Sequence, residues 1–148
     1  MRNYRIQWVL LVFFIPFLMG FCILSQGIKG HVSLEKEATM PMKDKSKQHG
    51  SPFSTIVYVY EATNLNQLIG QQGNWAKGLQ AKLVKQVRSD INGKFKLNLS
   101  PGKYTIVLGY KEGVYIPFFS GNTGVAYVEV LKRQYQEIDL TITASSIF

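Results

Sequence analysis

The chain has little of what metal, thiol or serine chemistry requires. Its 148 residues include one cysteine and two histidines. A catalytic zinc ion needs about three protein ligands, usually histidine with a carboxylate, and neither His31 nor His49 stands in an H-x-x-E spacing. Cys22 lies in an apolar run, so the rest of the chain has no disulfide and no thiolate. The G-x-S-x-G pattern of serine hydrolases does not occur either. We therefore expect no catalytic residue, no metal site and no cofactor.

A long uncharged apolar run occurs at the start of the chain, over Trp8–Leu24. Arg2 and Arg5 precede it, and the small and polar residues 25–27 follow it. A basic start, an apolar middle and a small-residue exit are typical of a secretory signal peptide. Residues 1–26 are therefore predicted to form a hydrophobic signal helix, and the domain over 27–148 is predicted to be exported, either to the periplasm or to the cell surface and medium.

The alternative is an uncleaved membrane anchor through residues 8–24. As a helix this run would span roughly 25 Å at 1.5 Å per residue, which is less than the ~30 Å hydrocarbon core of a bilayer, and Pro16 interrupts it. Lipidation of Cys22 is disfavoured because the bulky Phe21 precedes it. Cleavage is therefore the preferred interpretation.

The chain is basic, with a formal net charge of +8. A basic domain can bind nucleic acid or an anionic surface. The lysines are spread along the whole chain, and export removes the usual nucleic-acid partner. We expect no nucleic-acid binding and interpret most lysines as solvated strand faces that discourage edge-to-edge aggregation.

The clearest structural pattern lies between residues 90 and 110. Phe95, Leu97 and Leu99 alternate with polar residues, and after Ser100-Pro101-Gly102 the residues Tyr104, Ile106 and Leu108 alternate with Thr105 and Val107. Period-two alternation predicts half-buried strands, and proline with glycine predicts a tight turn. We predict a β-hairpin whose two strands pair with each other. Asp90–Gly93 is interpreted as a second turn, because further oxygen ligands for calcium are missing.

The pattern D-x-N-G-x-F-x-L-x-L-x-P-G-x-Y-T-I that begins at Asp90 resembles the central signature of the carboxypeptidase regulatory-like domain. That family is a small β-sandwich similar to transthyretin, and it is the accessory domain found beside zinc carboxypeptidases. The resemblance covers most of Gly27–Ile142. It implies an all-β, Greek-key sandwich of about seven strands, with no peptidase activity.

The remaining strands are placed by β-propensity and turn signals. They are predicted over 27–33, 53–60, 81–88 (a strand by position, a helix by propensity), and over 126–131 with 135–142 as a final pair. Loop insertions are predicted at 34–52 and 64–80. Strand 53–60 is apolar on both faces, with Tyr58 and Tyr60 on one and Val57 and Val59 on the other, and the buried face is left open.

Two groups of residues are candidate binding sites. Trp75 and Asn74, with Tyr115 and Asn122 as candidate neighbours, could bind a glycan, since aromatic rings stack on sugars and amides bond their hydroxyls. The alternative is that Trp75 folds back as a lid on the sandwich edge. Tyr58 and Tyr60 are candidate contacts for a protein partner. The prediction is a non-catalytic binding or structural module of the cell envelope, with a protein partner first and carbohydrate second.

Overall fold

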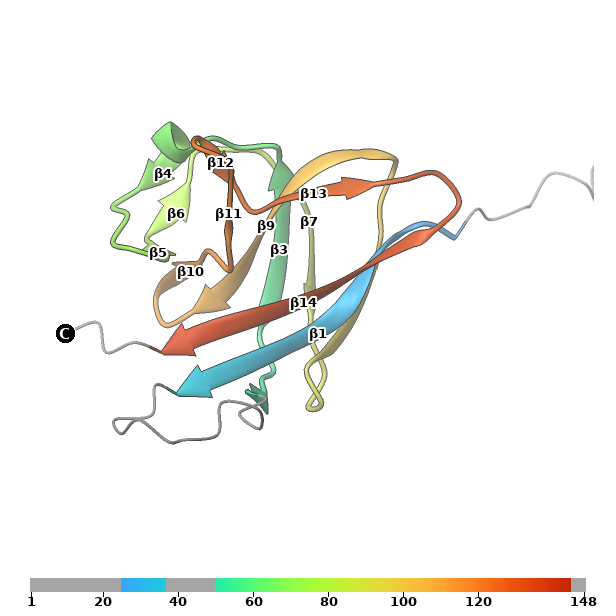
Figure 1. Cartoon of the computed structure of the whole chain (residues 1–148), viewed down its shortest axis with the longest axis horizontal. Helices are drawn as coiled ribbons and strands as arrows, with labels where there is room; N and C mark the ends of the chain where they lie inside the picture. The colour runs from blue at the N-terminus through green and yellow to red at the C-terminus, as the bar shows by residue number, and fades with distance from the viewer. Residues whose placement is uncertain (1–24, 37–49, 145–148) are drawn as a thin grey trace, which may run out of the picture.

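The computed structural model describes residues 25–36 and 50–144 (Figure 1). The predicted signal helix and the centre of the predicted insertion at 34–52 lie outside the described residues. Within the described ranges, no helix has the length and apolarity needed to cross a membrane.

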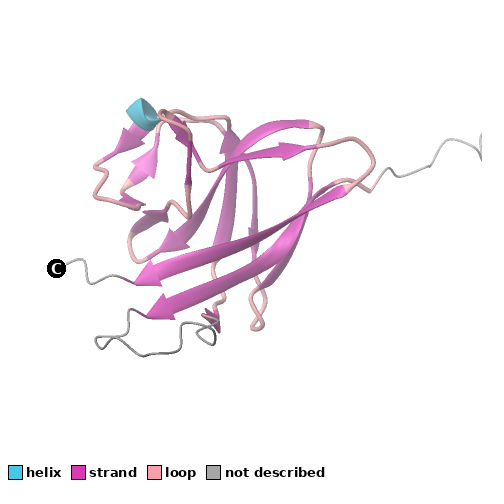
Figure 2. Cartoon of the chain, in the orientation of Figure 1, coloured by secondary structure: helices cyan, strands magenta, loops and turns pink. Residues whose placement is uncertain are grey.

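The described chain is almost entirely extended, with one short 3₁₀ turn (Figure 2). Its elements are, in order, β1 (Gly27–Lys36), β2 (Ser51–Pro52), β3 (Ile56–Glu61), η1 (Leu65–Gln67), β4 (Leu68–Ile69), β5 (Trp75–Ala76), β6 (Gly78–Leu79), β7 (Leu83–Arg88), β8 (Lys94–Asn98), β9 (Gly102–Tyr110), β10 (Gly113–Tyr115), β11 (Phe119–Ser120), β12 (Gly124–Val125), β13 (Tyr127–Val130) and β14 (Tyr135–Ala144).

Two sheets form a β-sandwich. The first sheet has the order β14-β1-β2, and β8 also pairs with β1. The second sheet has the order β5-β10-β9-β3-β7, and β13 also pairs with β9. β1 and β14 run parallel from Gly27↔Tyr135 to Lys36↔Ala144, whereas the other pairs are antiparallel. Figure 1 shows β1 and β14 crossing in front of β3 and β7.

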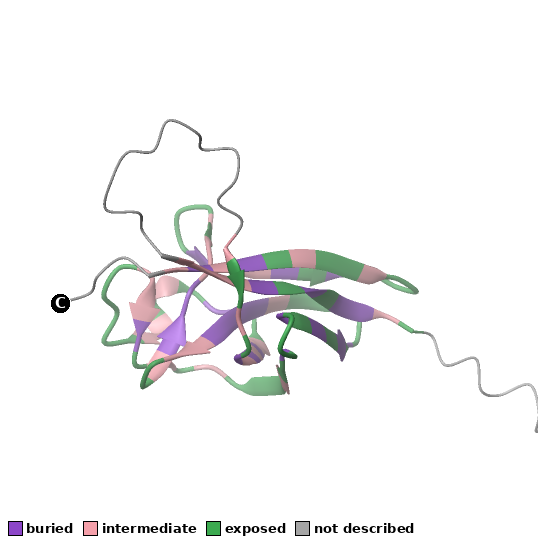
Figure 3. Cartoon of the chain, turned by 90° about the horizontal axis from the view of Figure 1, so that it is seen from below, coloured by how far each residue is buried: buried purple, intermediate pink, exposed green. Residues whose placement is uncertain are grey.

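The main hydrophobic core lies between the two sheets. Exposed and buried residues alternate along β8, so that Phe95 and Leu97 point inward and the lysines outward. Alternating buried and exposed positions along the strands are visible in Figure 3. Ile106 and Leu108 of β9 enter the same core, and Tyr104 packs partly against it. The inward faces predicted from the sequence alternation are therefore confirmed.

The predicted pairing of these two strands is wrong. β8 pairs with β1, while β9 pairs with β3, β10 and β13. Residues 100–102 therefore carry the chain from one sheet to the other, and the hydroxyl of Tyr104 donates to the Ser100 carbonyl (3.0 Å) across this crossover. A period-two pattern states which side of a strand is buried, but it does not state which strand lies beside it.

The predicted final pair is wrong for the same reason. β13 pairs with β9 in the second sheet and β14 with β1 in the first. Both strands nonetheless contribute to the main core, where Val128 and Val130 of β13 and Leu140 and Ile142 of β14 are buried.

The structure decides two alternatives that the sequence left open. Residues 83–88 form the strand β7, not a helix. In β3, Val57 and Val59 face the main core, and Tyr58 and Tyr60 lie half-buried on the outer face. The tyrosine face of this strand is therefore the accessible one.

A third, smaller layer covers part of the outer face of the second sheet. It consists of η1, β4, β6, β11 and β12 (Figure 1). Val107 of β9 is buried beneath it with Ala76, Ile116 and Val125, which explains why both faces of β9 are buried. The predicted loop insertion at 64–80 is thus folded, and the insertion at 34–52 is shorter than predicted because Leu34–Lys36 continue β1 and Ser51–Pro52 pair with it.

The turn predicted at Asp90–Gly93 is confirmed. One carboxylate oxygen of Asp90 accepts the backbone N–H groups of Asn92 and Lys94, each at 2.8 Å. Gly93 has a φ of 75°, a conformation that glycine adopts without steric cost. Short-range hydrogen bonds of an aspartate to the following backbone are a usual way to stabilise such turns.

Candidate binding groove

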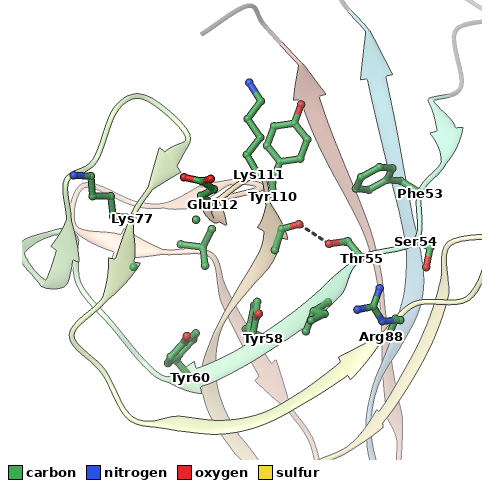
Figure 4. Close-up of a pocket in the computed structure, with 15 residues that line it drawn as sticks. Phe53, Ser54, Thr55, Tyr58, Tyr60, Lys77, Arg88, Tyr110, Lys111 and Glu112 are labelled. Atoms are coloured by element: carbon green, nitrogen blue, oxygen red, sulfur yellow. Dashed lines mark hydrogen bonds between the residues drawn. The ribbon is translucent and has the colours of Figure 1, made fainter. Parts of the chain in front are cut away.

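A groove opens on the outer face of the second sheet, beside the third layer (Figure 4). Its volume is about 630 Å³. Its lining comes mainly from β3, β9 and β10, together with residues 53–55 before β3 and residues 111–112 between β9 and β10. β6, β7 and the β5–β6 connection add one residue each. Its aromatic and charged lining residues are Phe53, Tyr58, Tyr60, Tyr110, Lys77, Arg88, Lys111 and Glu112. We call this feature the tyrosine groove.

Tyr58 and Tyr60 lie side by side in this groove because they alternate with Val57 and Val59 along β3. Their ring centroids are 6.3 Å apart and the rings are tilted by 38°. Both side chains are half-buried, so each ring presents part of its surface to the groove. Two adjacent, partly exposed tyrosines form an amphipathic surface, with apolar rings and polar hydroxyls.

The hydroxyl of Tyr60 stays protonated well into the alkaline range. Burial raises the pKa of Tyr60 above its ordinary value of 10.0, and the neighbouring Tyr58 raises it further. A neutral phenol can both donate and accept a hydrogen bond. The groove therefore keeps this bonding capacity at any physiological pH.

The position of Tyr58 depends on a glycine in the next strand. A Cβ atom on Gly109 would lie 3.3 Å from Cε2 of Tyr58, closer than ordinary packing allows, so the ring lies over the bare backbone of β9. At the end of the groove the Thr55 hydroxyl donates to the Gly109 carbonyl. The Thr55 N–H in turn donates to Ser89 Oγ at 2.9 Å. These contacts fix the start of β3 against β7 and β9.

The charged residues at the rim are predominantly basic. The groove is lined by three cationic side chains, Lys77, Lys111 and Arg88, and by one carboxylate, that of Glu112. The ammonium group of Lys111 lies 5.6 Å from the ring centroid of Tyr110, a cation–π distance. Among the described residues, the ion pairs involve Lys29, His31 and Lys82 with their partners and none of these rim groups. The rim groups are thus available to a ligand.

Trp75 does not line the groove, but its ring packs on a residue that does. Trp75 pairs with Tyr115 between β5 and β10. Its indole N–H donates to the Tyr110 carbonyl at 3.3 Å. The ring packs on Gly113, where an added Cβ would lie 2.7 Å from Cζ2. Gly113 itself lines the groove. The ring of Trp75 thus packs on the first residue of β10.

The structure brings three of the four predicted glycan-site residues together. The side-chain amide of Asn74 donates to the Ile116 carbonyl at 2.9 Å. This hydrogen bond places Asn74 beside the paired residues Trp75 and Tyr115. Tyr115 is only 5% exposed and its hydroxyl accepts the Thr143 N–H, so its ring offers no stacking surface. Asn122 lies on the exposed β11–β12 connection, beside Thr123, whose carbonyl accepts the Leu65 N–H of η1.

Sequence reasoning found the two central tyrosines but missed the charged rim. Lys77, Arg88 and Glu112 are distant in sequence and come from separate elements. No local motif joins them. Only the strand register places them around one groove, and a register of this kind cannot be read from one sequence.

The described residues contain no group of three or more His, Cys, Asp or Glu side chains placed to hold a metal ion. The aromatic rings, neutral hydroxyls and cations of the tyrosine groove are suited to noncovalent binding.

Comparison with known proteins gives no family for this chain. No family model, curated protein or solved structure matches it.

Proposed function

We propose that this protein is an exported, non-catalytic β-sandwich module of the cell envelope that binds a partner protein through the tyrosine groove. The observation that carries the proposal is the pair of half-exposed rings of Tyr58 and Tyr60 in an open groove. Tyrosine is enriched in protein interfaces because it combines a large apolar surface with a polar group. The resemblance of residues 90–106 to the carboxypeptidase regulatory-like domain supports a transthyretin-like, Greek-key assignment and an accessory role.

The groove fits an extended, acid-bearing segment of the partner. Its open shape accepts a chain lying along β3, and the rim formed by Lys77, Lys111 and Arg88 favours carboxylates over cations. Electrostatic complementarity of this kind contributes more to association rate and specificity than to affinity. The tyrosines are therefore the expected energetic centre.

Replacing Tyr58 or Tyr60 with aspartate is expected to reduce partner binding at least about tenfold, since central interface residues typically contribute about 2 kcal/mol or more. The measurement is affinity purification from the envelope fraction with the full chain as bait, followed by titration of the recovered protein. Tyr135→Asp, on the first sheet, is the matched control, and circular dichroism checks folding. Unchanged binding by folded Tyr58→Asp and Tyr60→Asp variants would rule out this site.

Carbohydrate is the second candidate ligand. The observation that favours it is the combination of tyrosine rings with lysine, arginine and glutamate groups around one groove, and Trp75 supports the wall of that groove. A glycan array with the full chain separates the two candidates. A signal that Tyr58→Asp removes would favour a sugar, and a blank array on folded protein would eliminate it.

Export is tested by the mass of the intact protein purified from cells. Cleavage of the proposed signal peptide is expected to leave a mature N-terminus near Gly27. A mass that begins at Met1 would instead support an anchor through residues 8–24 and would contradict cleavage.

A further inference from the structure

The first sheet ends in a long strand that has a neighbour on one side only. Within residues 25–36 and 50–144, β14 pairs with β1 alone, over its whole length of ten residues. β13, at the corresponding border of the second sheet, pairs with β9 alone. Figure 1 shows β14 at this border of its sheet. A border strand with unpaired backbone groups is a template for another chain.

The two border strands leave a groove of about 400 Å³ between them. Phe118, Val128, Leu131 and Ile138 give it an apolar lining, and Leu131 is 45% exposed. We call it the β13–β14 groove. On the opposite side of the sandwich, the Lys85 ammonium group reaches from β7 to the Asn98 carbonyl of β8 at 3.0 Å. A hydrogen bond thus links the two sheets at the β7–β8 border, whereas a groove lies between them at the β13–β14 border.

The lining of the β13–β14 groove is acidic although the chain is basic. The outward face of β14 carries Glu137 and Asp139, whose side chains are 66% and 81% exposed. Glu129 and Glu137 line the β13–β14 groove, and no lysine or arginine does. Lys29 lies 3.4 Å from Glu137, and His31 lies 3.8 Å from Asp139, both on the β1 side. Both carboxylates remain mostly exposed, so a partner strand on the other side of β14 can still reach them.

We propose that β14 is a strand-addition site for an extended segment of a partner protein in which apolar residues alternate with lysine or arginine. The partner backbone pairs with β14, its apolar side chains enter the β13–β14 groove, and its cations lie beside Glu137 and Asp139. This is the geometry of β-augmentation, in which backbone bonds supply affinity and alternate side chains supply specificity. Opposite charges at facing cross-strand positions stabilise such a pair.

A second copy of this chain fits the same edge poorly. Antiparallel pairing of two β14 strands centred on this region would bring Glu137 and Asp139 against the same carboxylates of the other copy. Like charges directly opposite each other destabilise a strand pair. Charge complementarity therefore favours a different, basic segment. The β13–β14 groove shares no lining residue with the tyrosine groove, so this site is independent of the proposed function.

The test uses the full chain and a capped six-residue peptide of alternating lysine and valine. The peptide is expected to bind in titration calorimetry and to slow hydrogen exchange at the amides of 135–144. A matched glutamate–valine peptide is expected to bind at least about tenfold more weakly, because carboxylates replace the two lysine side chains that would lie beside Glu137 and Asp139. Equal binding of both peptides, or unchanged exchange in β14, would overturn the proposal.

Charge variants locate the site. The double variant Glu137→Lys with Asp139→Lys is expected to weaken lysine–valine binding about tenfold or more. Glu61→Lys, on β3 and away from this edge, is the control with the same type of change and is expected to bind as the natural chain does. Equal loss in both would indicate a net-charge effect and overturn the assignment. Self-association of the natural chain through β14, seen by sedimentation, would overturn the choice of a different partner.

Discussion

Replacing Gly30 with valine is expected to detach β14 from β1 and leave the chain unfolded or severely destabilised. Gly30 pairs with Ile138 on one side and with Phe95 on the other. A Cβ atom at this position would overlap the carbonyl oxygen of Ile138, which is backbone and cannot rotate away. Forcing extra atoms into a packed region costs about 1–3 kcal/mol or more, and here the strand ladder is lost as well.

The measurement is urea unfolding followed by circular dichroism. Gly78→Ala is the matched control, because a Cβ atom there meets no other atom within 4 Å. We expect the control to unfold near the natural midpoint and Gly30→Val to show no cooperative transition or one at much lower urea concentration. Equal midpoints would mean that β1 and β14 are not paired as described.

Truncating Ile106 to alanine is expected to lower the free energy of unfolding by about 2–5 kcal/mol. Ile106 is fully buried in the centre of β9, opposite Val59 of β3, so its removal leaves a cavity between the two sheets. Domains of this kind have a total stability of only about 5–15 kcal/mol. The variant is therefore expected to lose a large share of it.

Ile91→Ala provides the control, because Ile91 is 85% exposed in the turn before β8. A surface truncation of this kind usually changes stability by no more than about 0.5 kcal/mol. Urea titration of both variants gives the comparison. Similar losses for Ile106→Ala and Ile91→Ala would contradict the core described between the sheets.

The alternation of residues predicted burial well and pairing poorly. Phe95 and Leu97 face the core as expected, but the strand that carries them lies beside β1 and not beside β9. Side-chain burial depends on the local period of the sequence, which can be read directly. Pairing depends on which sheet each strand joins, and this is decided by contacts between distant segments such as Gly30 and Ile138.

For the candidate sites as well, local alternation could be read from the sequence, but contacts between distant strands could not. Tyr58 and Tyr60 could be identified from one strand, because alternation alone puts both rings on one face. The two rings are accessible because Val57 and Val59, on the other face of β3, pack toward the first sheet. One sequence does not show which of the two faces packs inward. Trp75 illustrates the same limit, because an aromatic residue among amides does not reveal that its ring packs on Gly113.

The parallel pairing of β1 with β14 also determines how the domain responds to mechanical load. The chain enters β1 at Gly27 and leaves β14 at Ala144, at opposite ends of the same ladder. Tension between these two points pulls the strands past each other along their length. All ten residue pairs then bear the force together, in shear, and cannot open one after another like a zipper. A domain held at both ends would therefore resist stretching more strongly than its thermodynamic stability suggests.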